Sequence, residues 1–187
     1  GDVDEAAIQS AHSGFIPRAG GLAIYISILV LIPLLSFGFI PLSVVFDLDA
    51  EQLTLLILSA APVFSVGLAE DLGYDMSPKA RLVASAVSGM VAILLFKVWL
   101  DSLGIPGVDT LLMFAPFGIL FTIFATVGVV NAFNLIDGLN GLSSYVTVSV
   151  ALSLSIIAFQ AGDTQISIFL VLLVASVLGF MVLNFPM

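Results

Sequence analysis

The sequence predicts an all-α fold, a polytopic membrane bundle of about six transmembrane helices. Its mean hydropathy is +1.25, 60% of the 187 residues are hydrophobic and only 9% are charged, whereas an average soluble domain is about 25% charged. Long apolar stretches recur along the chain, most of them long enough to cross a hydrocarbon core of about 30 Å as a helix. No internal repeat divides the chain, so we expect residues 1–187 to form a single membrane domain.

Each span is bounded by acidic, Pro- or Gly-containing segments. The N-terminal segment, residues 1–19, is acidic and then broken by Gly and Pro. The second predicted span is short and contains Pro62, which membrane helices tolerate because neighbouring groups satisfy the freed backbone. The six predicted spans are Gly20–Ile40, Leu53–Leu68, Leu82–Leu100, Thr110–Val130, Leu142–Phe159 and Ile166–Leu183.

Charge and cysteine content exclude several classes of protein. The net charge of −9 argues against a nucleic-acid partner. The absence of cysteine excludes disulfides and thiolate metal sites.

The basic residues give the orientation of the predicted spans. Of the four Lys and Arg residues, Arg18, Lys79 and Arg81 fall on one side of the membrane, and Lys97 lies near the other. Basic residues favour the cytoplasmic side, so we expect the first side to face the cytoplasm. That side would carry residues 1–19, 69–81, 131–141 and the C-terminus, and the other side residues 41–52, 101–109 and 160–165.

A polar stretch, Asn131-Ala-Phe-Asn-Leu-Ile-Asp-Gly-Leu-Asn-Gly-Leu142, follows the fourth span. Asn131, Asn134, Asp137 and Asn140 recur every three residues, so a helical turn or two would align them on one face. A carboxylate at the centre of a spanning helix costs roughly 2.5–3.5 kcal/mol, and residues retained at that cost are usually functional. The predicted spans place Asp137 at the cytoplasmic edge, where that cost is smaller, but its grouping with three asparagines still indicates a functional residue.

The predicted cytoplasmic side gathers hard oxygen ligands and cations. Carboxylates and amide oxygens suit Mg²⁺, with Mn²⁺ as the alternative. Arginine and lysine bind phosphate oxygens, so the residues favour metal-assisted phosphoryl transfer at a membrane surface. The candidate residues are Glu70, Asp71, Asp137, Asn131, Asn134, Asn140, Arg18, Lys79 and Arg81.

Other interpretations remain open at this level. Glu70 and Asp71 alone are compatible with solvated surface, and Arg18 with an interfacial cation that only orients the chain. Asp137 with the asparagines is compatible with the cation site of an ion-coupled secondary transporter. An inactive membrane remnant is the third alternative.

Three segments resemble one family in the right order. The stretch Asn131–Leu142 closely resembles the signature of the polyprenyl-phosphate N-acetylhexosamine-1-phosphate transferase family. Ile16-Pro-Arg-Ala-Gly-Gly-Leu-Ala-Ile24 resembles the N-terminal Pro-Arg-x-Gly-Gly element of that family. Gly67-Leu-Ala-Glu-Asp-Leu72 followed by Ser77-Pro-Lys-Ala-Arg81 resembles its paired-acid loop.

The resemblance implies transfer of N-acetylhexosamine 1-phosphate from a UDP-sugar to undecaprenyl or another polyprenyl phosphate, with release of UMP. This is the first step of lipid-linked cell-envelope glycan synthesis, such as that of O-antigen or cell-wall polymers. It implies a multi-pass protein of the bacterial inner membrane with its active site facing the cytoplasm. A homodimer, and the choice between a covalent intermediate on Asp71 and direct attack, are left open.

The resemblance also assigns roles to residues. Asp137 and Asp71 would hold Mg²⁺, and the Glu70–Asp71 pair would assist metal binding or catalysis. Phosphate or substrate contacts would come from Arg18, Lys79, Arg81, Asn131, Asn134 and Asn140.

Three departures from the family pattern accompany the match. Glu70 replaces an aspartate that is common in the family, and its side chain is one methylene longer. Asn140 is at a position where many members have aspartate. The chain stops before the Gly-Asp-rich loop and the later His-containing loop of the family. We therefore expect a fragment that also lacks a first helix. Pro17-Arg18-Ala-Gly-Gly21 is more similar to the branch that makes lipid-linked N-acetylhexosamines than to the peptidoglycan branch.

Overall fold

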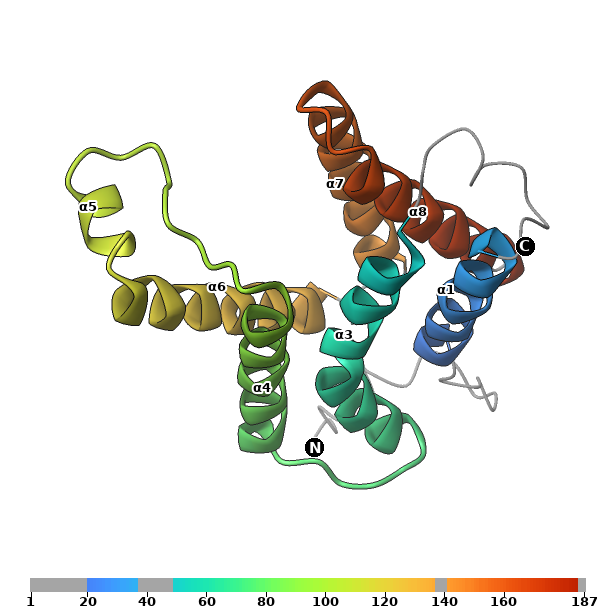
Figure 1. Cartoon of the computed structure of the whole chain (residues 1–187). Helices are drawn as coiled ribbons and strands as arrows, with labels where there is room; N and C mark the ends of the chain where they lie inside the picture. The colour runs from blue at the N-terminus through green and yellow to red at the C-terminus, as the bar shows by residue number, and fades with distance from the viewer. Residues whose placement is uncertain (1–19, 37–48, 137–140, 185–187) are drawn as a thin grey trace, which may run out of the picture.

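A computed structural model describes residues 20–36, 49–136 and 141–184, and these ranges contain helices, turns and no strand (Figure 1). The predicted all-α class is confirmed. The described helices are α1 (Gly20–Ser36), α3 (Ala50–Asp71), α4 (Pro78–Phe96), α5 (Val108–Leu112), α6 (Ala115–Ile136), α7 (Leu142–Gln160) and α8 (Thr164–Asn184).

Five of these helices, α3, α4, α6, α7 and α8, are long and apolar enough to cross a membrane, and α1 contains a shorter apolar helix, Gly20–Leu31. Large apolar side chains lie on their outer surfaces; Leu94 is 67% exposed, Phe124 73% and Val182 75%. Such a surface is stable in lipid and costly in water. The polytopic membrane bundle is therefore confirmed, with five of the six predicted spans described at full length.

Caps at both ends place α4 earlier in the chain than the third predicted span. We predicted Leu82–Leu100, but α4 runs from Pro78 to Phe96. The side chain of Ser77 accepts a hydrogen bond from the Ala80 amide, and Pro78 occupies the first turn, a combination that starts helices. Lys97 adopts a left-handed conformation with φ 55°, which ends the helix.

The start of the fourth predicted span was wrong. Instead of beginning at Thr110, the chain forms α5 and then α6 from Ala115. The indole Nε1 of Trp99 donates to the Leu112 carbonyl at 3.2 Å, and the Leu100 amide donates to Thr122 Oγ1 at 2.9 Å. These contacts fold the preceding loop against the first turns of α6.

The end of that span was wrong as well, because α6 continues to Ile136. Asn131 and Asn134 therefore belong to its last turns, and not to a loop over residues 131–141. The predicted loop 69–81 is shortened in the same way, since Glu70 and Asp71 end α3, and Lys79 and Arg81 lie in the first turn of α4.

Neighbouring helices pack in the spatial order α6, α4, α3, α1, α8, α7 (Figure 1). The pairs α3–α4 and α7–α8 are hairpins joined by short turns, and α6 crosses α4. Buried Ile28, Leu53 and Ile57 join α1 to α3, where the rings of Tyr25 and Phe64 stack with centroids 3.9 Å apart.

Small residues are buried where α4 packs against its neighbours. Ala84, Ser85, Ser88 and Gly89 are buried on α4, and Gly89 faces Thr126 of α6, as in many close membrane-helix contacts. Pro62 lies inside α3, and the next amide, that of Val63, donates to Ser88 Oγ at 3.1 Å. A side chain of α4 thus supplies an acceptor where the proline disturbs the backbone of α3.

We expect Ser88→Ala to destabilise this hairpin by about 1–2 kcal/mol, because the Val63 amide loses its side-chain acceptor in a dry contact. Unfolding in mixed micelles with increasing SDS measures the change. Ser65→Ala is the matched control on α3, since Ser65 is exposed and donates only to the Ala61 carbonyl of its own helix. Equal stability of the two variants would contradict the role of Ser88.

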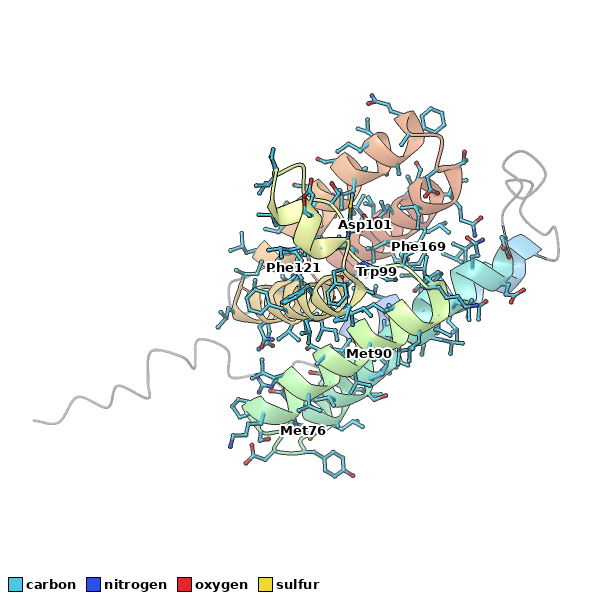
Figure 2. All side chains as sticks on the ribbon, turned by 60° about the vertical axis from the view of Figure 1, so that its left-hand side comes forward. Met76, Met90, Trp99, Asp101, Phe121 and Phe169 are labelled. Atoms are coloured by element: carbon cyan, nitrogen blue, oxygen red, sulfur yellow. The ribbon has the colours of Figure 1, made fainter. Side chains whose placement is uncertain are left out.

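At the opposite end of the α3–α4 hairpin, Asp49, the residue before α3, forms hydrogen bonds with Gln165 of α8. The Gln165 side chain donates to the Asp49 carbonyl at 2.8 Å and accepts from the Asp49 amide at 3.2 Å. Asp49 also caps α3 by accepting from the Glu51 and Gln52 amides. Figure 2 shows this separation of ends: Met76, in the α3–α4 turn, lies far from Trp99 and Asp101.

Asp109 organises the loop before α5. The Leu103 amide donates to its carboxylate at 2.8 Å and lowers the pKa of Asp109 below its usual range. Because the folded-state pKa is depressed, the stabilisation is present above the unfolded pKa of about 3.9 and is lost as the pH falls through the lower, folded value.

We therefore expect the fluorescence of Trp99, the single tryptophan of the chain, to change in acid, below about pH 4. Asp109→Asn keeps an acceptor oxygen but cannot titrate, so its fluorescence should stay flat over that range. An identical acid transition in this variant would remove Asp109 as its cause.

Candidate functional site at the α3–α4 turn

The last residues of α3 and the first of α4 form the most highly charged described part of the chain. α3 ends at Asp71, with Leu72 closing its last turn, and α4 starts at Pro78 after the Ser77 cap. Because the two helices are antiparallel neighbours, Glu70, Asp71, Lys79 and Arg81 lie at one end of the hairpin.

One ion pair joins the two helices at this end. A terminal nitrogen of Arg81, Nη2, lies 2.5 Å from Glu70 Oε1. The two side chains are partly buried, with 32% of Arg81 and 37% of Glu70 exposed. The Nε of Arg81 is buried and has no hydrogen-bond partner among the residues that the structure describes.

Asp71 and Lys79 flank this pair and are exposed. The N-terminus of α4 carries backbone N–H groups and the positive end of the helix dipole, an arrangement that favours anions. Lys79 and Arg81 add two cations in its first turn. The turn therefore combines two carboxylates with a surface suited to a phosphate group.

The predicted asparagines do not join this group by any described hydrogen bond. The amide nitrogen of Asn131 donates to the Val127 carbonyl of its own helix at 2.8 Å, and Asn134 is exposed in the last turns of α6. Both lie in the last turns of α6, which crosses α4 away from the α3–α4 turn (Figure 1), so the structure does not bring them to the charged turn.

Three further predicted residues, Arg18, Asp137 and Asn140, lie outside the described residues, so their positions stay predictions. Within the described ranges, no three His, Asp or Glu side chains come together as a metal site. The described carboxylates at the turn, Glu70 and Asp71, are hard oxygen donors of the type that Mg²⁺ takes. Asp137 would have to complete the set, and it follows directly after the end of α6.

The sequence indicated both Glu70 and Arg81 as site residues but predicted separate roles for them, metal binding or catalysis for Glu70 and phosphate binding for Arg81. The structure pairs them. Opposite charges on either side of a short turn between two helices are the only signal in the sequence for this contact.

Two cavities lie elsewhere in the described part of the molecule. One, of about 560 Å³, lies at the far end of the α3–α4 hairpin and is lined by residues that include Gln52, Leu95 and Gln165. The other, of about 420 Å³, lies between α1 and α8. Neither is lined by a charged residue of the turn.

The fold and this site define a polytopic membrane protein with a carboxylate- and cation-bearing centre at one end of its helices. The chain belongs to glycosyl transferase family 4, which it matches over residues 53–187. The match includes the α3–α4 turn and the Asn131–Leu142 stretch, so the predicted family relationship is confirmed.

Curated relatives are similar to almost the whole chain. The undecaprenyl-phosphate alpha-N-acetylglucosaminyl 1-phosphate transferase of Escherichia coli (strain K12) is 28% identical over 184 residues, which are 98% of this chain and 47% of that protein. The protein of the same name from Salmonella typhi is 32% identical over 188 residues, again 98% of this chain and 47% of the relative. The chain thus spans about half the length of the curated relatives it matches. No solved structure matches the chain.

Proposed function

We propose that the protein carrying this chain transfers N-acetylhexosamine 1-phosphate from a UDP-sugar to a polyprenyl phosphate and releases UMP. The proposal places the reaction at the cytoplasmic face of the bacterial inner membrane, at the start of lipid-linked glycan synthesis. The observation that carries it is the grouping of Glu70, Asp71, Lys79 and Arg81 at one end of the α3–α4 hairpin, within the family match. Family membership gives no support to the transporter alternative.

The proposed reaction does not need a strong general base. A phosphate monoester has a second pKa of about 6, so the lipid phosphate is mostly ionised near neutral pH. One of its oxygens attacks the phosphorus that bears the sugar, and the bond from that phosphorus to the UMP oxygen breaks. The main tasks of the protein are to bring two anions together and to stabilise charge on the leaving phosphate.

The residues at the turn suit these tasks. Lys79 and Arg81 are placed to offset phosphate charge at the start of α4. We propose Asp71, at the end of α3, and Asp137, which lies outside the described residues, as ligands for Mg²⁺. Bound there, Mg²⁺ would neutralise the diphosphate and polarise its oxygens. We propose this metal dependence from the hard-oxygen character of the ligands.

The test is an assay on membranes that contain the complete gene product. Radiolabelled UDP-GlcNAc, undecaprenyl phosphate and Mg²⁺ are supplied, and lipid-extractable label is measured with and without EDTA. We expect a labelled lipid product that EDTA abolishes and added Mg²⁺ restores. If no UDP-N-acetylhexosamine yields a lipid-linked product, the proposal is wrong; activity unaffected by EDTA would remove the metal from it.

A further inference from the structure

The connection between α4 and α6, residues 97–114, exposes large apolar side chains. The large apolar residues of this connection that are more than half exposed are Val98, Ile105, Leu111, Met113 and Phe114. Helix α5, which belongs to the connection, packs mainly against α6, and Figure 1 shows both projecting from the other helices. An exposed apolar surface of this kind marks a contact with a membrane or with another protein.

Several polar groups of the α4–α6 connection are bonded within it or to α6. The Asp109 carboxylate accepts hydrogen bonds from the Leu103 amide at 2.8 Å and from the Ser102 hydroxyl at 3.0 Å. The Trp99 indole donates to α5 and the Leu100 amide donates to α6. A segment with paired donors and exposed apolar side chains suits the boundary of a bilayer, because unpaired backbone groups are costly where water is scarce.

The exposed apolar surface continues from the connection onto α6. The rings of Phe114 and Phe117 have centroids 6.0 Å apart. Phe117, Leu120 and Phe124 are all more than half exposed and follow one another at helical spacing on one face of α6. Because α6 is long and apolar enough to cross a membrane, this face contacts lipid. The surface of the connection is therefore continuous with a lipid-facing surface.

The charges of the connection favour an apolar contact with lipid over recognition of anionic headgroups. Lys97 is its single basic residue, and Asp101 and Asp109 make it acidic overall. Segments that bind anionic lipids carry clusters of lysine and arginine, whereas insertion of apolar side chains at the boundary of a bilayer does not depend on such a cluster.

We propose that the α4–α6 connection is a membrane-interface element. It lies between the headgroups and the acyl chains, on the membrane face opposite the α3–α4 turn, because α4 starts at that turn and ends at Phe96. Ile105 and Met113 are among the side chains that enter the acyl region. This inference concerns a lipid contact that the proposed reaction does not involve, and it holds whether or not that reaction takes place.

Spin labels on the full-length protein in phosphatidylcholine nanodiscs test the lipid contact. Because the chain contains no cysteine, single cysteines can be introduced once any cysteines outside this chain have been replaced. Labels at Ile105→Cys and Met113→Cys report on the connection. Gln160→Cys, exposed at the α7–α8 turn, is the reference for water, and Phe124→Cys on α6 is the reference for lipid. Electron paramagnetic resonance measures accessibility to oxygen, which concentrates in lipid, and to a water-soluble nickel complex.

We expect the ratio of oxygen to nickel accessibility at both connection sites to be several-fold higher than at Gln160 and to approach that at Phe124. A ratio equal to that at Gln160 would show a loop in water and overturn the inference. Low accessibility to both reagents would show a contact with protein, either a second copy or another part of the same protein, and would overturn it as well. A high ratio that appears only with phosphatidylglycerol would show headgroup recognition instead.

Quenching of Trp99 by brominated phosphatidylcholine tests the same position without a label. The difference in emission between wild type and Trp99→Phe isolates Trp99 from tryptophans elsewhere in the protein. An element near the headgroups predicts stronger quenching by bromine high on the acyl chain than by bromine near the end of the chain. Any other order of quenching, or none, would contradict the interface position.

Discussion

Asp137→Asn is expected to lower formation of the lipid-linked sugar by roughly 10²–10³-fold, the usual cost of removing one group that stabilises the charge of a transition state. Asn is close to Asp in size and removes one negative charge. The proposed reaction joins two anions, so loss of a residue that would hold Mg²⁺ should affect kcat more than the KM for either substrate. Initial rates with varied UDP-GlcNAc, at saturating undecaprenyl phosphate, measure the two separately.

Asp101→Asn is the matched control for this variant. It makes the same substitution at an exposed aspartate near Trp99, away from the α3–α4 turn (Figure 2), and its activity should remain within about twofold of wild type. Comparable losses in both variants would indicate a general effect of charge. Full activity of Asp137→Asn would remove Asp137 from the proposed site.

Gly118→Ala is expected to destabilise the corner between α5 and α6 by about 1–3 kcal/mol, because there is no space for a side chain at this position. A Cβ there would overlap Trp99 Cδ1 and the backbone carbonyl oxygen of Leu112. The indole would have to move and would lose its hydrogen bond to the same carbonyl. A shifted emission maximum of Trp99 and a lower midpoint of thermal unfolding in detergent are the expected results.

Gly128→Ala provides the comparison within the same helix. A Cβ at Gly128 meets nothing within 4 Å, and alanine favours helix over glycine by roughly 0.8–1.0 kcal/mol. This variant should be neutral or slightly more stable, with unchanged Trp99 emission. If Gly118→Ala behaves in the same way, the close packing of Trp99 on α6 is wrong.

The predicted spans agree well with the structure where the ends of a helix are set by its own residues and by the adjoining turns. The predicted Leu142–Phe159 and Ile166–Leu183 match α7 and α8 to within two residues at each end. Errors arose where another part of the chain sets the boundary. The loop after α4, which contains Trp99, packs against the start of α6. The hydrophobic pattern of α6 does not predict this contact.

The candidate site was predicted as a set of residue types and not as a set of contacts. The spacing and the family resemblance identified Glu70, Asp71, Lys79 and Arg81 and assigned them to one end of the helices. Which acid faces which cation depends on the rotation of α3 against α4, which is fixed by contacts between the helices such as that of the Val63 amide with Ser88. Sequence spacing does not encode that rotation.

Hydropathy, helix length and the Asn131–Leu142 signature are properties of contiguous residues, so the sequence was sufficient to predict the membrane class, the approximate number of spans and the family. The packed bundle was needed to show that Ser88 supplies the acceptor beside Pro62 and that Glu70 pairs with Arg81. Each of these contacts joins different helices. Their geometry follows from how the helices pack, and packing is a property of the whole bundle and not of any one segment.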